Sequence, residues 1–162
     1  MRTLQQRKSF GVTVPTIPLT GVNILALECQ DDLVKQPLPE GVARRKVIEV
    51  IRPIFKMVDV FNLYNVEVYI DALGLSIHPD CRGCGLADAM LKARFELCRE
   101  LGVKITKTVF TGIASQKVGL RCGFKVIKEI LLKDIVTSNG DLYFRDFPLL
   151  NKVLITVKEI DI

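Results

Sequence analysis

Aromatic residues and long apolar runs are scarce in this chain of 162 residues. Phe, Trp and Tyr make up 7% of the sequence, and there is no Trp. Because proteins that hold single-stranded nucleic acid stack bases on aromatic side chains, this scarcity argues against such a platform. No apolar run approaches the roughly 20 residues that a membrane-spanning helix needs. The basic N-terminus lacks a continuous apolar segment behind its charges, so we expect no secretory signal.

Cysteines are few, and their number is odd. Five cysteines at scattered spacing do not form a disulfide framework, so we expect a reducing compartment and a cytoplasmic protein. His78, Cys81 and Cys84 have zinc-ligand spacing, but the fourth ligand would have to be Cys98 or Cys122. No second Cys-x-x-Cys exists, so we expect no metal. An alternative is redox control, in which a Cys81–Cys84 disulfide distorts the local loop.

The composition otherwise fits one globular domain. Apolar residues make up 49% and charged residues 25% of the chain, which is enough for one sizeable core. The net charge of +5 weakly favours an anionic partner such as a phosphorylated cofactor. We predict a single domain over residues 1–162, in which residues 1–20 are irregular apart from a short strand at Val12–Val14.

The hydrophobic periodicity predicts strands alternating with helices, hence an α/β or α+β domain. The strand–helix–strand run from Val66 to Phe110 predicts parallel pairing through a crossover helix. Its helix, residues 86–101, is the best defined, with Gly102 ending it. Pro53 lies inside the helix predicted at 42–64 and should kink or divide it. The remaining expected strands are 21–29, 124–134 and 151–160, and the remaining helix is 115–122.

One loop has the pattern of a phosphate site. A strand ends at Ile77, a tight glycine-containing loop follows, and a helix begins at Leu86. Backbone N–H groups and the positive end of the helix dipole converge there, and Arg82 adds a full charge.

Two other glycine-rich loops are excluded. A dinucleotide fingerprint counted from Gly83 fails because Asp88 occupies its sixth position, and no Gly-Lys-Ser/Thr exists. What remains is Arg-x-x-Gly-x-Ala at Arg82, Gly85 and Ala87.

That motif resembles the acetyl-CoA loop of the GNAT superfamily of N-acetyltransferases. Leu75-Ser76-Ile77 resembles the family's fourth strand, whose backbone pairs with the pantetheine arm. Residues 108–115, followed by Cys122-Gly123-Phe124, resemble its fifth strand, fourth helix and Gly-Phe. The run 55–64 is similar to the insect arylalkylamine N-acetyltransferase branch, which includes dopamine acetyltransferases. The resemblance covers roughly residues 20–160.

The resemblance implies a GNAT-like acyl-CoA N-acyltransferase fold, with a central mixed twisted sheet flanked by helices. It also implies acetyl-CoA as cosubstrate and direct attack of a small primary amine, plausibly an arylalkylamine such as dopamine, on the thioester. Thr111 and Ser115 would be linked to the proton transfers, and Ser115 is also predicted to be a helix N-cap. The implied cofactor-binding residues are Leu75, Ser76, Ile77, Arg82, Gly83, Cys84, Gly85, Leu86, Ala87 and Ser115.

The general base stays unassigned. The branch's glutamate base lies before the family's third strand, which Gly21 begins to resemble. Only about 20 residues precede Gly21, too few for a strand and two helices. Asp71 is a candidate base, but a surface carboxylate at a strand end is the favoured interpretation. His78 is favoured as a turn residue over a base. In the helix at 42–64, Phe55, Val58 and Phe61 belong either to the core or to the acceptor pocket.

Two alternative functions remain open. One is an acetyl-CoA-binding domain without activity, and the other is acetylation of a polyamine or a protein. The basic run at 44–46 is favoured as a solvated helix face over a nucleic-acid patch. We therefore expect a monomer with no nucleic-acid or membrane partner.

Overall fold

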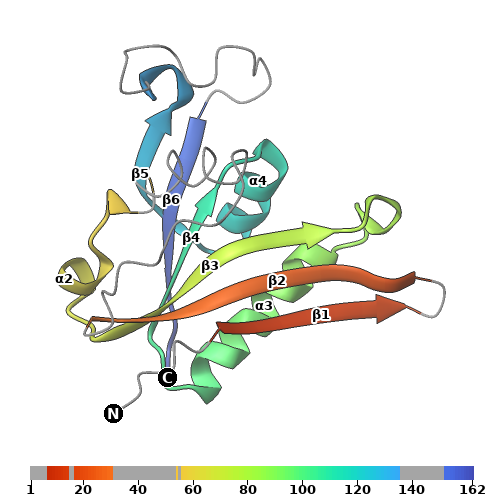
Figure 1. Cartoon of the computed structure of the whole chain (residues 1–162), viewed down its shortest axis with the longest axis horizontal. Helices are drawn as coiled ribbons and strands as arrows, with labels where there is room; N and C mark the ends of the chain where they lie inside the picture. The colour runs from red at the N-terminus through yellow and green to blue at the C-terminus, as the bar shows by residue number, and fades with distance from the viewer. Residues whose placement is uncertain (1–6, 15–16, 31–53, 55, 136–151) are drawn as a thin grey trace, which may run out of the picture.

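The computed structural model describes residues 7–14, 17–30, 54, 56–135 and 152–162. They form one six-stranded mixed sheet in the order β1-β2-β3-β4-β6-β5, flanked by helices (Figure 1). The elements are β1 (Arg7–Val14), β2 (Ile17–Cys29), α2 (Val60–Tyr64), β3 (Val68–Ile77), η2 (Pro79–Cys81), α3 (Leu86–Glu100), β4 (Ile105–Phe110), α4 (Ile113–Arg121), β5 (Lys125–Leu131), η3 (Leu132–Asp134) and β6 (Lys152–Glu159). No helix in these ranges is long and apolar enough to cross a membrane.

Strands β3 and β4 are parallel, as predicted, but they stay together only briefly. Their register pairs are Ile70↔Thr106, Asp71↔Lys107 and Ala72↔Thr108. Beyond Ala72 the strands diverge, and Figure 1 shows β3 turning away from β4. A bulge lies at the same point, because Leu25 of β2 pairs with Ala72 while its neighbour Ile24 pairs with Gly74. A bulge bends its strand and increases its twist, so the extra residue at this point opens a gap in the sheet.

Helix α3 is the crossover between β3 and β4, and it buries the apolar stripe that its periodicity predicts. Leu91, Phe95 and Cys98 join one core cluster with side chains of the strands and of the residues next to them. These are Leu25, Ile70, Ala72 and Phe110 in the strands, and Val103, Phe124 and Ile160 just outside them. Gly102 follows the helix with a φ of 66°, the left-handed conformation expected for the residue that ends a helix. The core therefore fixes α3 against the strands that part beside it.

The N-terminal region differs from the prediction. Residues 7–14 form strand β1 and residues 17–20 begin β2, whereas we expected residues 1–20 to be irregular apart from a short strand at Val12–Val14. Strand β1 pairs antiparallel with β2 from Arg7↔Ala26 to Val14↔Ile17. The strand is formed by hydrogen bonds to its neighbour, which the local residue pattern of 7–14 does not reveal.

The long helix predicted at 42–64 is not continuous over its described part. Ile54 and Lys56 are helical, residues 57–59 are not, and α2 begins after Asp59. The Asp59 carboxylate accepts a hydrogen bond from the Asn62 N–H at 3.2 Å and so caps the new helix. Residues 42–53 and 55, including Pro53 and the basic run at 44–46, lie outside the described residues.

Three residues of that helix were assigned either to the core or to the acceptor pocket, and two of them belong to the core. Val58 packs against two buried clusters, and Phe61 contacts Tyr69 edge to face at 4.9 Å between ring centroids. Neither residue lines the large cavity described below. Phe55, the third, is outside the described residues.

We expect Gly119→Ala to destabilise the fold. Gly119 of α4 is buried, and a Cβ at this position would lie 2.2 Å from the nearest ring carbon of Phe110. Phe110 belongs to the main core cluster, so its ring cannot move without disturbing that packing. Overpacking of this kind costs about 1–3 kcal/mol. Urea unfolding should show the loss, while Gly74→Ala, with nothing within 4 Å of its Cβ, should be milder; equal losses would contradict the steric explanation.

Candidate active site

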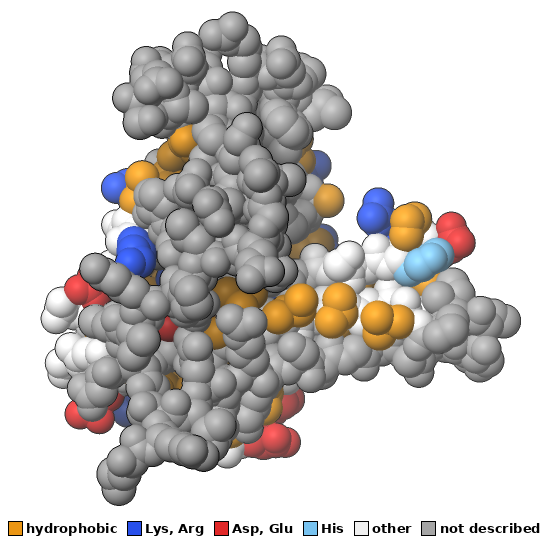
Figure 2. All heavy atoms as spheres, in the orientation of Figure 1, with side chains coloured by type: hydrophobic (Ala, Val, Ile, Leu, Met, Phe, Trp, Pro, Cys, Tyr) orange, Lys and Arg blue, Asp and Glu red, His pale blue; other side chains and the backbone are white. Residues whose placement is uncertain are grey.

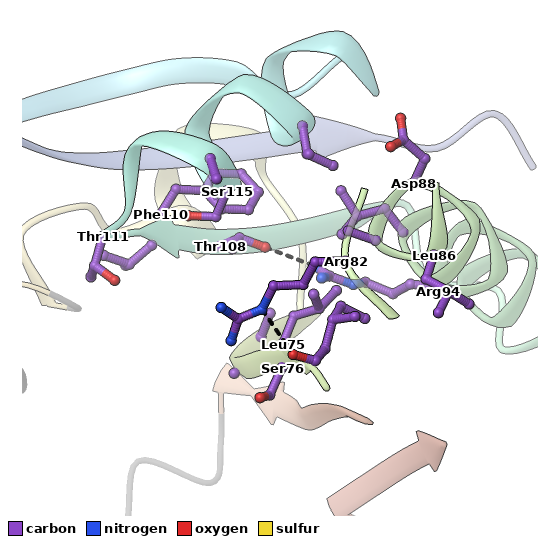
Figure 3. A pocket seen from close by; sticks show the side chains of 18 of the residues that line it. Leu75, Ser76, Arg82, Leu86, Asp88, Arg94, Thr108, Phe110, Thr111 and Ser115 are labelled. Atoms are coloured by element: carbon purple, nitrogen blue, oxygen red, sulfur yellow. Dashed lines mark hydrogen bonds between the residues drawn. The ribbon is translucent and has the colours of Figure 1, made fainter. Parts of the chain in front are cut away.

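A cavity of about 700 Å³ lies where β3 and β4 part. This size is typical of sites for small molecules and cofactors. Figure 3 shows its side chains converging from β3, the loop before α3, β4 and α4. The described lining residues are Ile54, residues 72–77, Cys81, Arg82, Gly83, residues 85–88, Leu91, Arg94, residues 108–111, Ala114, Ser115, Val118, Arg121 and Val153.

The loop before α3 has the backbone of an anion site. Gly83 and Gly85 have φ values of 81° and 82°, a region that side-chain-bearing residues rarely adopt. Gly85 is the N-cap of α3, and no side chain of the described residues is seen to cap the helix there. The first N–H groups of α3 therefore remain available for a negatively charged ligand in the cavity.

Arg82 stabilises this loop through a hydrogen bond and gives it a positive charge. Its Nε donates to the carbonyl of Ile77 at 3.2 Å, which ties the loop to the end of β3 (Figure 3). The side chain is exposed and lines the cavity. The described geometry thus brings Arg82 together with the two loop glycines, as the motif predicts.

Cys84 alone among the predicted loop residues does not line the cavity. Its exposed thiol donates to the Cys81 carbonyl at 2.7 Å, and both cysteines are free. His78 caps the short η2 turn, because its Nδ1 accepts from the Asp80 N–H at 3.4 Å. In the described part of the chain, no three His, Cys, Asp or Glu residues are grouped to hold a metal ion.

Thr111 and Ser115 both line the cavity, near the start of α4 (Figure 3). The prediction that Ser115 is the N-cap is wrong: the N-cap is Gly112, and Ser115 lies three residues into the helix. Its hydroxyl reaches back, accepting from the Gly112 N–H at 3.2 Å and donating to the Gly112 carbonyl at 2.8 Å. The extended backbone of Gly112 makes this early start possible, so the hydroxyl is held at the cavity wall.

A second arginine lies at the α3 end of the cavity. Arg121 of α4 binds Asp88 of α3 through Nε–Oδ1 at 2.9 Å and Nη2–Oδ2 at 2.5 Å. These hydrogen bonds lower the pKa of Asp88 and raise that of Arg121. The two residues are 33 positions apart in the chain, so sequence reasoning did not reveal this pair. Asp88 is the single carboxylate among the described lining residues, and Arg121 neutralises it.

Arg94 is another lining residue that sequence reasoning missed. The side chain is fully buried, and its Nη1 donates to the Thr108 hydroxyl at 2.6 Å (Figure 3). Burial lowers the pKa of Arg94 to about 10, which leaves the side chain charged at neutral pH. The available signal was its position, since residue 94 follows Leu91 by three and precedes Cys98 by four, within the buried stripe.

Asp71 is buried, so its interpretation as a surface carboxylate at a strand end is wrong. It forms an ion pair with Lys107 at 2.9 Å, and the two side chains are 7% and 3% exposed. Burial raises the pKa of Asp71 to about 6, although the charge of Lys107 opposes the shift. Neither residue lines the cavity.

The cavity is lined by residues from both faces of the sheet. Leu91 and Arg94 come from α3 on one face, whereas Ile54 packs with Val153 on the other. Figure 2 shows a row of hydrophobic side chains over the region that β2 and β3 cross in Figure 1. Leu73 of β3 is 45% exposed and lines the cavity, so apolar surface continues to its mouth.

Known proteins that resemble this chain were found only among solved structures. No family model matches the sequence, and no curated protein matches it. A mosquito protein, provisionally named arylalkylamine N-acetyltransferase 7 of Aedes aegypti, is 30% identical with a TM-score of 0.75 over 88% of this chain. The present chain spans 60% of that protein's length.

Two further structures share the architecture at lower identity. Arylalkylamine N-acetyltransferase 2 of Aedes aegypti is 23% identical with a TM-score of 0.84, covering 94% of this chain and 73% of its own. A polyamine N-acetyltransferase of Drosophila melanogaster is 15% identical with a TM-score of 0.76, covering 94% and 74%. The chain therefore has the GNAT acyl-CoA N-acyltransferase fold and resembles the insect arylalkylamine N-acetyltransferases.

Proposed function

We propose that the chain binds acetyl-CoA in the cavity between β3 and β4 and transfers the acetyl group to a small primary amine. The favoured substrate is an arylalkylamine such as dopamine. The observation that carries this proposal is the cavity itself, which joins the glycine loop before α3 to a gap lined from both faces of the sheet. Such a gap can hold an acyl donor and an acceptor at the same time.

The cavity offers complementary groups along the length of acetyl-CoA. The phosphates would bind at the uncapped N-terminus of α3 and at Arg82. The pantetheine arm contains two amides, and residues 75–77 of β3 have backbone groups facing β4 without pairing to it. Pairing an extended ligand with a free strand edge is a common mode of recognition. The acetyl end would then lie near Ala72 and Thr108, where the strands meet.

Acyl transfer requires proton movement that the side chains at the start of α4 can assist. The amine nitrogen attacks the thioester carbon, the C–S bond breaks, and the nitrogen loses a proton. Thr111 and Ser115 are the hydroxyls we propose for this proton transfer, because both line the cavity at the start of α4. Asp88 is a poor base, since its hydrogen bonds to Arg121 lower its pKa. A relay of these hydroxyls and solvent is the proton path we propose.

Replacing the two hydroxyls should slow turnover without preventing cofactor binding. Groups that assist proton transfer contribute about 10²–10⁴-fold to rate, so we expect kcat to fall about 100-fold in the Thr111→Val, Ser115→Ala double variant. Ser115→Ala should also cost about 1 kcal/mol, because it removes the hydrogen bonds to Gly112. Steady-state kinetics and thermal melting measure the two effects separately. A double variant with an unchanged kcat would exclude both hydroxyls, and Thr111→Ser serves as the conservative control.

One experiment tests the proposed function directly. CoA release from acetyl-CoA would be followed with dopamine, tryptamine, agmatine, spermine and short peptides, alongside a thermal-shift measurement with CoA alone. We expect turnover with dopamine or tryptamine. Stabilisation by CoA with no turnover would support the alternative of a binding domain without activity. Neither stabilisation nor turnover would overturn the proposal.

Acetylation of a polyamine is the second candidate. It has support from the fold, since structures named for agmatine and polyamine N-acetyltransferases share it. A polycationic amine needs carboxylates, however, and Asp88 of the described lining is neutralised by Arg121. Exposed apolar side chains near the cavity, such as Leu73, favour an aromatic amine instead. Turnover of spermine or agmatine without turnover of dopamine would reverse this preference.

A further inference from the structure

We infer that Thr108 donates a hydrogen bond to the sulfur of CoA during acyl transfer, and that the buried Arg94 positions and strengthens this donor. The inference rests on the proposed function, because it requires CoA to lie in the cavity. It assigns a catalytic role to Thr108 and a positioning role to Arg94, neither of which follows from the sequence motif.

Thr108 lies where the reacting end of an acyl donor would arrive. It is the last residue of β4 that pairs with β3, opposite Ala72, so it marks the closed end of the gap between the strands. The anion-binding loop lies at the other end of this gap, beyond Ile77. A ligand arm that starts at the loop and follows β3 inward therefore ends beside Thr108.

The Thr108 hydroxyl has a hydrogen to give to a ligand. A threonine hydroxyl has one hydrogen and two acceptor positions, and Arg94 fills an acceptor position by donating at 2.6 Å. No acceptor for the Thr108 hydroxyl hydrogen occurs among the described residues. Thr108 is nearly buried, and the surface it retains lines the cavity. The structure thus holds its oxygen in place and leaves its hydrogen free to point at a bound ligand.

Arg94 provides a positive charge behind this hydroxyl. Its guanidinium is fully buried, and within the described ranges no carboxylate lies within ion-pair distance of it. The side-chain amide of Asn23 lies between Arg94 and the Gly74 carbonyl. In the orientation that gives both of them a hydrogen bond, its oxygen accepts from Arg94 Nε at 3.2 Å and its nitrogen donates to the Gly74 carbonyl at 3.1 Å. The Phe124 ring lies 5.7 Å from the guanidinium carbon. These contacts tie Arg94 to β2, β3 and β4 at the point where the sheet opens.

A buried charge that no described carboxylate pairs with favours negative charge at the neighbouring site, even though the more distant Asp71 charge also acts on Arg94. Buried charges are normally paired because burying an unpaired charge has a large cost. In a site of low polarity, a fixed cation and a fixed donor stabilise developing negative charge far more than they would in water. Arg94 polarises the Thr108 hydroxyl, so the donor at the end of the cavity becomes stronger.

The step balances without proton transfer from Thr108. The amine nitrogen forms a bond to the carbonyl carbon, the C–S bond breaks, and its electron pair stays on sulfur. The thiolate accepts the hydrogen bond from Thr108, whose proton remains on oxygen. The proton lost by the amine leaves through the relay proposed above and can later protonate the thiolate.

A binding experiment tests the assignment without turnover. Affinities for CoA and for desulfo-CoA, which lacks the sulfur, would be measured by calorimetry between pH 6.5 and 9. In the native chain, the ratio of the affinities for CoA and desulfo-CoA should rise with pH, because the bound CoA thiol ionises to the thiolate. The total rise should be about 10-fold for each unit by which binding lowers the pKa of the CoA thiol. Thr108→Val should remove this growth and Thr108→Ser should retain it. An unchanged preference in Thr108→Val would overturn the assignment.

Steady-state kinetics give a second test, because a purely structural role for Thr108 would not lower kcat selectively over KM. Thr108→Val should lower kcat at least 10-fold while the KM for acetyl-CoA stays within about 3-fold, and Thr108→Ser should recover most of kcat. Arg94→Lys keeps the charge but changes the donor geometry, so its kcat should lie between those of Thr108→Val and Thr108→Ser. A Thr108→Val variant with full kcat, or one that has lost binding of both ligands, contradicts the assignment. If the native chain itself does not bind CoA, the proposed function fails, and this inference fails with it for that separate reason.

Discussion

Lys107→Met is expected to lower the free energy of unfolding by about 3–5 kcal/mol at pH 8, because it leaves the Asp71 carboxylate buried without its counter-ion. Asp71 Oδ1 already has no hydrogen-bond partner among the described residues. Loss of the Lys107 ammonium also removes its contact with Asp71 Oδ2 at 2.9 Å, which stabilises the negative charge of the carboxylate. Urea unfolding of the variant and the native chain measures the difference.

The pH dependence of this loss identifies its cause. Burial already raises the pKa of Asp71 to about 6, above its unfolded value of 3.8, and removal of Lys107 should raise it further. A group with a raised folded pKa contributes stability at low pH and loses it as the pH rises through that pKa. The difference between Lys107→Met and the native chain should therefore narrow as the pH falls from 8 to 5.

Two control variants separate the buried charge from the loss of a lysine. Asp71→Asn combined with Lys107→Met has no carboxylate, so it should be more stable at pH 8 than Lys107→Met and should lack its pH dependence. Lys152→Met removes a lysine from a pair with Glu129 whose side chains are 43% and 45% exposed, and it should cost at most about 1 kcal/mol. If the double variant is no more stable than Lys107→Met, the buried charge is not the cause.

Gly85→Trp should weaken binding of CoA by about 100-fold or more. Gly85 is the N-cap of α3 with φ of 82°, and open space lies beyond the position of a Cβ. A tryptophan side chain would occupy that space in front of the loop N–H groups. Loss of two hydrogen bonds to a charged group, at about 1.5–3 kcal/mol each, corresponds to at least this reduction in affinity. Calorimetry with CoA measures it.

Gly102→Trp is a matched control for the strain that the substitution introduces. Gly102 also has a positive φ of 66° with no atom within 4 Å of a Cβ, but it lies at the far end of α3 and does not line the cavity. Both variants should lose roughly 1–2 kcal/mol of stability, since left-handed backbone is unfavourable for side-chain-bearing residues. Only Gly85→Trp should lose CoA affinity. Equal affinities in the two variants would exclude the loop as the phosphate site.

The sequence alone predicted the features that depend on neighbours along the chain. The apolar stripe of 86–101 predicts helix α3, because residues three and four apart share a helix face. The strand, glycine loop and helix around Arg82 predict an anion site, because the N–H groups of a loop and a helix start depend on local backbone. The parallel pairing of β3 and β4 follows from the length of the connecting helix.

Tertiary structure alone decided the features formed by residues far apart in the chain. Strand β1 requires β2 as a partner, and the Asp71–Lys107 pair requires two strands side by side. The Arg94–Thr108 contact joins a helix to a strand where the bulge opens the sheet. Burial changes the chemistry of these groups, because a charge that water would solvate must find a partner inside the protein. The scarcity of aromatic residues argued against a stacking platform, and the shape and lining of the cavity were decided by the parting of β3 and β4.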